Sequence, residues 1–295
     1  MTGRLIERMR LRNDSLLAEV VPQVGGGLAR LDWLGGAQPE PVLRALPADV
    51  EGIPLPGQLA CFPLLPWSNR MAPSGFMFEG DRHVPAPNRD GEPCPIHGDG
   101  WQQPWQVSSR TDTSLLLTLA RADAGPFSYH AGLRYTLDGP ALLVDLAVTN
   151  TGAAALPFGI GLHPWMPDPG GAVLHAAAAS VWMSGADKLP VERGAVPLPW
   201  RFDVPAALPP DGVDHVFEGW PGRARIAWPA RGVSLEIEAD MDYFILYAPP
   251  GRDFFCFEPV DHPINAHNLA GYPGLSVLAP GATLRRRCVF RGGPA

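Results

Sequence analysis

Polar and apolar residues alternate along several stretches of the chain, as they do in strands with one buried face. In residues 233–240, Val233, Leu235 and Ile237 share one side while Glu236 and Glu238 share the other. This pattern predicts a half-buried antiparallel strand. Similar runs predict further strands at residues 4–11, 15–21, 28–34, 113–120, 225–229 and 243–249.

Two breaks in the pattern predict hairpins. Asp138-Gly139-Pro140 separates two alternating runs within residues 133–150, and Ala279-Pro280-Gly281 separates residues 275–278 from 283–291. Turn residues between two such runs favour a hairpin connection. Helical periodicity is weak along the whole chain.

Closely spaced strands without intervening helices indicate an all-β sandwich or large barrel, mostly antiparallel. The 35 prolines and 33 glycines also disfavour long helices. Proline-rich stretches near residues 85–95 and 190–212 are expected to be surface loops, and neither separates regions of different composition. We therefore predict one domain over residues 1–295, because all-β domains can exceed 250 residues.

Composition and charge narrow the possible partners. With 46% hydrophobic and 18% charged residues, the chain has enough apolar material to fold, and its net charge of −7 gives no general attraction to nucleic acid or anionic lipid. Charged residues occupy the positions where a signal peptide needs an apolar run: Arg4, Glu7, Arg8, Arg10 and Arg12. No later stretch is long enough to cross a bilayer. We expect a cytoplasmic protein without nucleic-acid or membrane partners.

The candidate chemistry begins with the histidines. His97 precedes Gly98, and His163 follows a glycine-rich segment and precedes Pro164. Glycine and proline fix the backbone direction and let a ligand approach closely, although each histidine could equally be structural. His262 follows a carboxylate. Structural or exposed roles are expected for His130, His175 and His267.

Other polar residues stand in aromatic or loop settings. Glu258 ends the apolar run 254–257, so it is either a solvent-facing strand end or a buried base in a pocket. Asn69 and Arg70 can donate to hydroxyl oxygens. Asp214 could bind a hydroxyl or cap a turn. Trp67 could stack on a sugar ring, but a core position is favoured.

Several common site motifs are absent. The sequence contains no G-x-S-x-G, P-loop or H-E-x-x-H motif. The cysteines form no C-x-x-C pair, so reduced and mostly buried thiols are expected, and no metal is predicted. The remaining set of His, Glu, Asp and Arg suits proton transfer on a polar, uncharged substrate.

The order of these pieces resembles the aldose 1-epimerase (galactose mutarotase) family over most of the chain. The resemblance is carried by Asn69-Arg70, His97-Gly98, Gly161-x-His163-Pro164-Trp165, Asp214-x-x-Phe217, Phe257-Glu258-Pro259 and His262-Pro263-x-x-Ala266-x-Asn268. It implies a β-supersandwich of galactose-mutarotase type and a cofactor-independent isomerase that interconverts the α and β anomers of a free aldose.

The resemblance also implies residue roles. Glu258, ionised at the start, would remove the C1 hydroxyl proton, and His163, protonated at the start, would protonate the ring oxygen. His97 would hydrogen-bond the reacting oxygens. Sugar hydroxyls would be bound by Arg70, Asn69 and Asp214, with Trp165 lining the site.

Three alternatives remain. Arg82, His83 and Arg89 lie between two of the motifs, so the substrate could be an anionic sugar, such as a hexose 6-phosphate or a sulfonated or uronic sugar. The protein could instead be a non-catalytic sugar-binding module on the same fold. A domain that only contacts other proteins would be favoured if His97, His163 and Glu258 were distant from one another. The sequence does not predict the oligomeric state.

Overall fold

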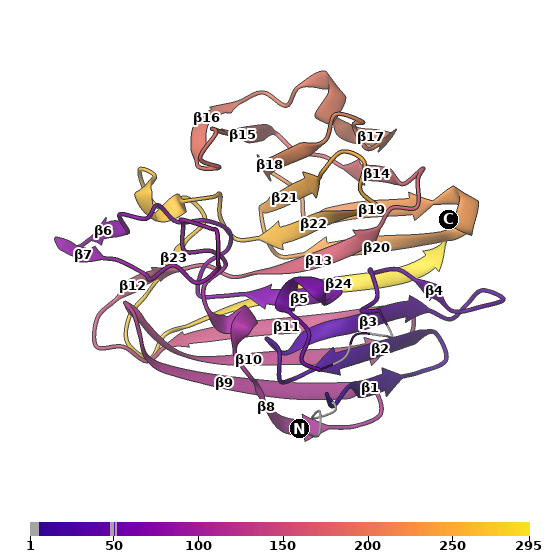
Figure 1. Ribbon diagram of the computed structural model, residues 1–295, viewed down its shortest axis with the longest axis horizontal. Coiled ribbons are helices and arrows are strands. Elements are labelled where there is room, and N and C mark those ends of the chain that lie inside the picture. The colour runs from indigo at the N-terminus through magenta and orange to yellow at the C-terminus, as the bar shows by residue number, and fades with distance from the viewer. Residues whose placement is uncertain (1–5, 48–49, 51) are drawn as a thin grey trace.

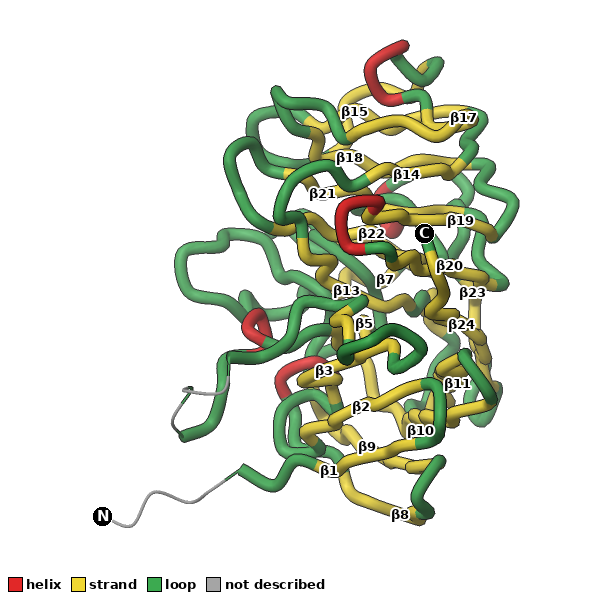
Figure 2. The backbone as a smooth tube through the Cα atoms, turned by 90° about the vertical axis from the view of Figure 1, so that its right-hand side faces the viewer, coloured by secondary structure: helices red, strands yellow, loops and turns green. Residues whose placement is uncertain are grey.

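Two large β-sheets face each other and pack their apolar sides together (Figures 1 and 2). The computed structural model describes residues 6–47, 50 and 52–295. The first sheet contains, in spatial order, β1 (Met9–Arg12), β2 (Leu16–Val21), β3 (Gly27–Trp33), β5 (Cys61–Leu64), β13 (Gly161–Pro167), β22 (Phe254–Val260), β21 (Tyr243–Ala248), β18 (Val213–Glu218), β15 (Ser180–Ser184) and β16 (Pro190–Gly194), with β4 (Glu40–Pro41) paired to β3.

The second sheet completes the sandwich. It contains β17 (Phe202–Ala207), β14 (Val173–Ala176), β19 (Arg223–Trp228), β20 (Val233–Ala239), β24 (Thr283–Pro294), β11 (Ala141–Asn150), β10 (Phe127–Asp138), β9 (Ser114–Ala124) and β8 (Gln106–Arg110). Two small pairs join β12 (Leu156–Phe158) to β23 (Ser276–Leu278) and β6 (Phe76–Phe78) to β7 (Asp81–His83). Every strand pair in both large sheets is antiparallel.

The helices among the described residues are short 3₁₀ turns. They are η1 (Pro56–Gln58), η2 (Gly100–Gln102), η3 (Leu198–Trp200), η4 (Pro229–Arg231) and η5 (Ala266–Asn268). No helix in this part of the chain has the length and apolarity to span a membrane. The prediction of an all-β sandwich is confirmed.

The alternating patterns predict the strands and one hairpin correctly. In β20 the apolar residues are buried and Glu236 and Glu238 are exposed. β10 and β11 pair with Asp138 opposite Ala141, so the hairpin turns at Gly139-Pro140. The first predicted strand is shorter than expected, since β1 begins at Met9, and residues 4–5 of that prediction lie outside the described residues.

The second predicted hairpin is wrong. β23 pairs with β12, whereas β24 pairs with β11 and β20 in the second sheet. The Asn150 side chain helps to divert the chain, because its amide donates to the Leu278 carbonyl (2.7 Å). The backbone N–H of Gly281 then donates to the Asn150 carbonyl, so the turn leads into a different sheet.

The proline-rich stretch 190–212 is also not simply a loop, because it contains β16 and β17. Each lies at the edge of its sheet, where a proline need not donate to a neighbouring strand. Residues 85–95 do form a loop without strands, as predicted.

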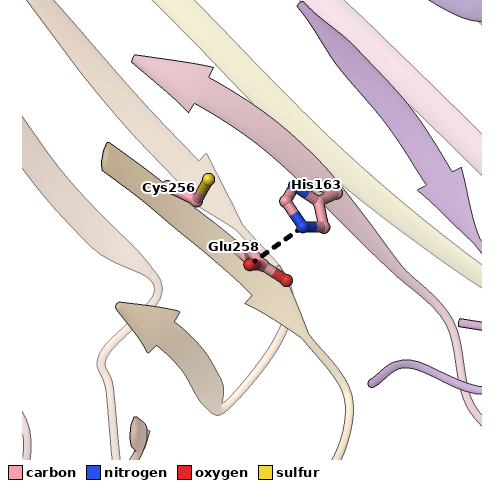
Figure 3. A group of neighbouring side chains, drawn as sticks. All are labelled: His163, Cys256 and Glu258. Atoms are coloured by element: carbon pink, nitrogen blue, oxygen red, sulfur yellow. Dashed lines mark ion pairs between the residues drawn. The ribbon is translucent and has the colours of Figure 1, made fainter. Parts of the chain in front are cut away.

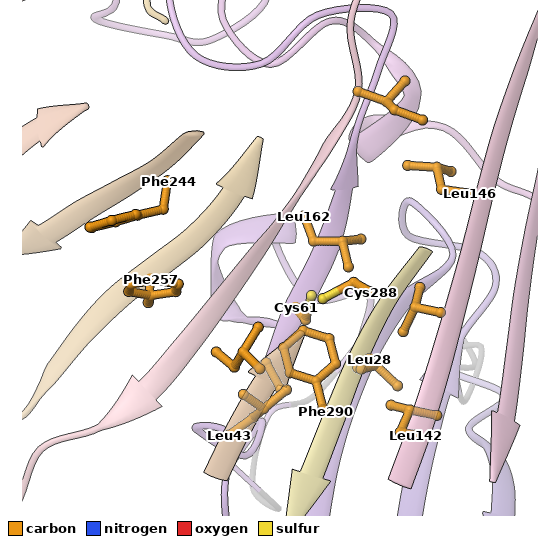
Figure 4. Close-up of a cluster of buried hydrophobic side chains, with 14 of the residues drawn as sticks. Leu28, Leu43, Cys61, Leu142, Leu146, Leu162, Phe244, Phe257, Cys288 and Phe290 are labelled. Atoms are coloured by element: carbon orange, nitrogen blue, oxygen red, sulfur yellow. The ribbon is translucent and has the colours of Figure 1, made fainter. Parts of the chain in front are cut away.

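The core between the sheets fixes which side chains can face outward. Phe257 of β22 stacks on Phe244 of β21 with ring centroids 4.5 Å apart, and Leu142 and Phe290 approach from the second sheet (Figure 4). All four cysteines are reduced and buried, as expected. Because Phe257 faces the core, Glu258 faces the outer side of the first sheet. Loops gather over that side (Figure 2).

Candidate functional site

His163 and Glu258 meet as a cross-strand pair on the outer face of the first sheet (Figure 3). The register that pairs Trp165 with Cys256 places His163 opposite Glu258. The Nε2 atom of His163 lies 3.3 Å from Oε1 of Glu258. Only 7% of His163 and 2% of Glu258 is exposed. The two acid/base candidates from the sequence therefore touch in a buried setting.

Burial sets the protonation of this pair. It raises the pKa of Glu258 well above its usual value, with a further increase from the Asp214 charge and an opposing effect of Arg70. It lowers the pKa of His163 to about 3, and the charges of Arg44 and Arg89 act in the same direction. Burial therefore acts against an ionised Glu258 beside a protonated His163, the starting state expected from the sequence.

His97 lies beside this pair on a loop that is hydrogen-bonded to the loop carrying Asn69. Its ring centroid is 5.2 Å from that of His163, with the rings nearly perpendicular. The His97 N–H donates to the Asn69 carbonyl (2.9 Å), and the Asn69 N–H donates to Nδ1 of His97 (3.1 Å). Since Nδ1 accepts, neutral His97 carries its proton on Nε2 and can donate from there. Both residues adopt positive φ, 63° and 52°.

The expected hydroxyl-binding residues are themselves paired. Arg70 Nε and Nη2 lie 2.9 and 2.7 Å from the same oxygen of Glu92. The Asn69 side-chain oxygen accepts from the Arg70 N–H (2.8 Å). Asp214 is 3.2 Å from the Lys188 ammonium, and 29% of its side chain is exposed. Each of these side chains is thus held in place by a partner.

Aromatic rings flank His163. Phe62 stacks on its imidazole at 4.6 Å between centroids, and Trp165 stacks at 5.2 Å. The Arg44 guanidinium carbon lies 3.9 Å from the Trp165 ring centroid. Trp67 is buried in the core, as favoured from the sequence. Of the two tryptophans considered, only Trp165 contacts the acid/base pair.

Residues after Glu258 anchor the loop that carries Asn69 and Arg70. Ser68 N–H donates to Nε2 of buried His262 (3.0 Å), whose Nδ1–H donates to the Pro263 carbonyl (2.8 Å). The Asn265 side-chain oxygen accepts from the Ala72 N–H (2.9 Å). Asn268 donates to the Gly75 carbonyl (3.1 Å). The H-P-x-x-A-x-N motif therefore fixes a neighbouring loop.

We expect His262 to make the protein less stable in acid. Burial lowers its pKa to about 4, whereas an unfolded imidazole titrates near 6.5. Between these values the unfolded state binds more protons, so the free energy of unfolding falls as the pH drops from about 6.5 to about 4. At pH 4.5 the loss attributable to His262 is about 2–3 kcal/mol. Denaturant unfolding at pH 7 and 4.5 should show a smaller drop for His262→Gln than for wild type.

The matched control for this measurement is His130→Gln, because His130 is exposed on β10. Its drop in stability should equal that of the wild type. An equal drop in all three proteins would show that His262 does not cause the acid sensitivity.

The glycines beside the histidines are required for packing. A Cβ at Gly98 would overlap the Leu65 carbonyl, and one at Gly159 would overlap the His262 ring. The space at Gly161 is filled by Pro259 and Val260 of the neighbouring strand. We expected these glycines to let a ligand approach, but they instead let neighbouring segments of the chain pack closely.

A separate hollow lies on the outer face of the second sheet. It measures about 870 Å³ and is lined by small and charged residues, among them Gly132, Arg134 and Arg287. Arg287 is already paired with Asp145. The hollow contains none of the candidate residues, so the buried acid/base pair is the better candidate for chemistry.

The basic residues that suggested an anionic substrate separate into two groups. Arg82 lies on β7 and donates to the Ser74 carbonyl, and His83 stacks on Phe76. Arg89, in contrast, is close enough for its charge to lower the pKa of both His97 and His163. Only Arg89 of these three is electrostatically linked to the site.

Sequence reasoning missed several contributors, including Phe62 and Arg44 beside His163 and Trp165. Glu92 and Lys188 are charged loop residues whose partners could not be identified without the fold. Asn88 holds the His97 loop by donating to the carbonyls of Ile96 and Gly98. Cys256 shares the outward face with Glu258 two residues later, so strand alternation could have identified it.

Comparisons with known proteins identify the family and the fold. A family model described as aldose 1-epimerase matches residues 7–291. The chain is 34% identical over 281 residues to the uncharacterized protein YphB of Escherichia coli (strain K12), covering 92% of this chain and 93% of that protein. A crystal structure from Escherichia coli K12, described as a candidate aldose 1-epimerase, superposes with a TM-score of 0.91 at 30% identity, covering 99% and 100% of the two chains. A galactose mutarotase-like protein of Clostridium acetobutylicum shares the fold, with a TM-score of 0.84, 16% identity and 100% of both chains covered.

Proposed function

This chain belongs to the aldose 1-epimerase family, and we propose that it interconverts the α and β anomers of a free aldose. The observation that carries the proposal is the buried 3.3 Å contact between His163 and Glu258. Opening a cyclic sugar requires one group to take the C1 hydroxyl proton while another protonates the ring oxygen. Adjacent carboxyl and imidazole groups can perform both transfers.

In the proposed mechanism the C1 hydroxyl first donates a hydrogen bond to Glu258. Hydrogen bonding to a carboxylate stabilises its charged form, so binding shifts the shared proton to His163. Glu258 then takes the C1 hydroxyl proton, the C1–O5 bond breaks, and O5 takes the proton from His163. Rotation about C1–C2 and closure with reversed roles give the other anomer and restore the pair.

His97 would assist by donating from Nε2 to a reacting oxygen. Its Nδ1 is occupied by the Asn69 N–H, and burial lowers its pKa, so the ring stays neutral and keeps a single donor. A neutral donor stabilises the negative charge that develops on oxygen without adding a second buried cation.

Asp214→Asn is expected to act mainly on substrate binding. The carboxylate would accept from sugar hydroxyls before the transition state, so KM should rise roughly 10-fold while kcat changes little. The Asp214 charge raises the pKa of Glu258. Removing this charge should therefore lower the pH at which activity falls off on the alkaline side. Initial rates at several pH values measure both effects.

The control is Asp211→Asn, an exposed aspartate at the turn before β18. It should leave KM and the pH profile unchanged. If Asp214→Asn behaves in the same way, Asp214 does not bind the sugar, and its charge does not affect the pKa of Glu258.

The proposed function is tested by following anomer exchange by NMR with neutral and anionic aldoses. Acceleration over the spontaneous rate is expected for at least one sugar. Anionic sugars are included because the positive charge of Arg89 lowers the pKa of the site histidines. Binding without acceleration of any sugar would instead indicate a sugar-binding module.

A further inference from the structure

Cys256 lies directly beside the Glu258–His163 pair (Figure 3). Residues 256 and 258 of β22 share the outward face, and His163 approaches from β13. One ligand atom from each side chain, an imidazole nitrogen, a sulfur and a carboxylate oxygen, lies within 4.8 Å of the others. The sequence spacing concealed this set because it comes from two separate strands.

We propose that His163, Cys256 and Glu258 form a binding site for a thiophilic divalent cation, with Zn²⁺ as the best fit. Zn²⁺ binds imidazole nitrogen, thiolate and carboxylate, and three protein ligands leave the fourth tetrahedral position for water. Typical zinc–ligand distances place two tetrahedral ligands about 3.4 Å apart. The His163–Glu258 separation of 3.3 Å already matches this spacing. The sulfur lies within 4.8 Å of the other two ligand atoms, so it would need to move by no more than about 1.4 Å.

Burial and charge support the assignment. The Oε2 atom of Glu258 is buried and has no hydrogen-bond partner among the described residues. A buried thiolate or carboxylate is costly by itself. When Zn²⁺ replaces the thiol and carboxyl protons, which leave to solvent, the two anions balance the ion and the site carries no net charge.

The ion would bind the same side-chain atoms that transfer protons in the proposed reaction. Bound Zn²⁺ would prevent Glu258 and His163 from exchanging protons with a sugar, so it should inhibit in competition with substrate. This consequence rests on the proposed function, whereas metal binding itself does not.

Co²⁺ gives a readout that is independent of activity. Titrating the reduced, full-length protein with Co²⁺ should produce thiolate-to-cobalt charge-transfer absorption that saturates at one equivalent. The absorption should be absent in Cys256→Ser and in His163→Asn, whose folding is checked by circular dichroism. Cys94→Ser, which removes a buried thiol from a loop outside this set, should retain it.

The activity arm separates the two proposals. Zn²⁺ should inhibit anomer exchange, a chelator should restore it, and Cys256→Ser should weaken the inhibition about 10-fold or more. If the folded wild type shows no thiolate absorption, or if Cys256→Ser retains it, the metal site is wrong whether or not the enzyme is active. If the absorption appears but no sugar is turned over, the metal site stands and the proposed function fails.

Discussion

Replacing Glu258 by glutamine is expected to remove most of the anomer exchange, about 10²- to 10⁴-fold in kcat, while sugar binding persists. The amide has the same size and can still hydrogen-bond His163, but it cannot accept and return a proton. Glu258 is 2% exposed and lies 3.3 Å from His163, so no other carboxylate of the described residues is known to stand in for it there. NMR exchange rates measure turnover, and calorimetric titration measures binding.

Glu218→Gln is the matched control for this experiment. Glu218 lies on β18, on the same outer face of the sheet, where it accepts from Trp182 Nε1 (2.8 Å) and pairs with Arg193 (2.6 Å). It has no contact with His163, so its substitution should leave kcat within a few-fold of wild type. Retention of more than a tenth of the activity by Glu258→Gln would refute the assignment of Glu258 as the base.

Gly98→Ala is expected to cause the second large loss. Gly98 has a φ of 63°, and a Cβ there would overlap the Leu65 carbonyl. Since that neighbour is backbone, the loop must shift and carry His97 with it. We expect about 3 kcal/mol or more of destabilisation and about 100-fold lower kcat/KM. Denaturant unfolding and NMR exchange rates measure the two effects.

Gly232→Ala separates backbone strain from close packing. Gly232 has nearly the same φ, 65°, but a Cβ there would meet no atom within 4 Å. It should cost only the conformational penalty of about 1–2 kcal/mol and leave activity unchanged. If the two alanine variants lose equal stability and activity, packing against Leu65 does not position His97.

Strand alternation explains why much of the fold could be predicted from the sequence. The apolar positions of β11 and β20 follow a period of two, and this parity alone assigns their buried faces. The apolar run before Glu258 does not alternate, so the structure rather than the sequence assigns Phe257 to the core and Glu258 to the outer face. The turn at residues 279–281 defeated this reasoning, because a turn signal does not specify which sheet the next strand joins.

The sequence identified the candidate site residues, but it did not identify the residues with which they form ion pairs. His97, His163 and Glu258 stand in distinctive local sequences, whereas Glu92 and Lys188 are ordinary loop residues until the fold places them beside Arg70 and Asp214. Protonation was also not predictable, because the sequence contains no measure of burial. Desolvation raises the pKa of Glu258 and lowers that of His163, which opposes the charge state expected from proximity alone.

The anchoring of the Asn69 loop has a consequence during synthesis. Ser68, Ala72 and Gly75 leave the ribosome 193 or 194 residues before their hydrogen-bond partners His262, Asn265 and Asn268. Contacts across such long separations form late, because the intervening chain must first be ordered. During synthesis this loop can therefore be fixed, and the acid/base centre completed, only after the segment from Glu258 to Asn268 has been made.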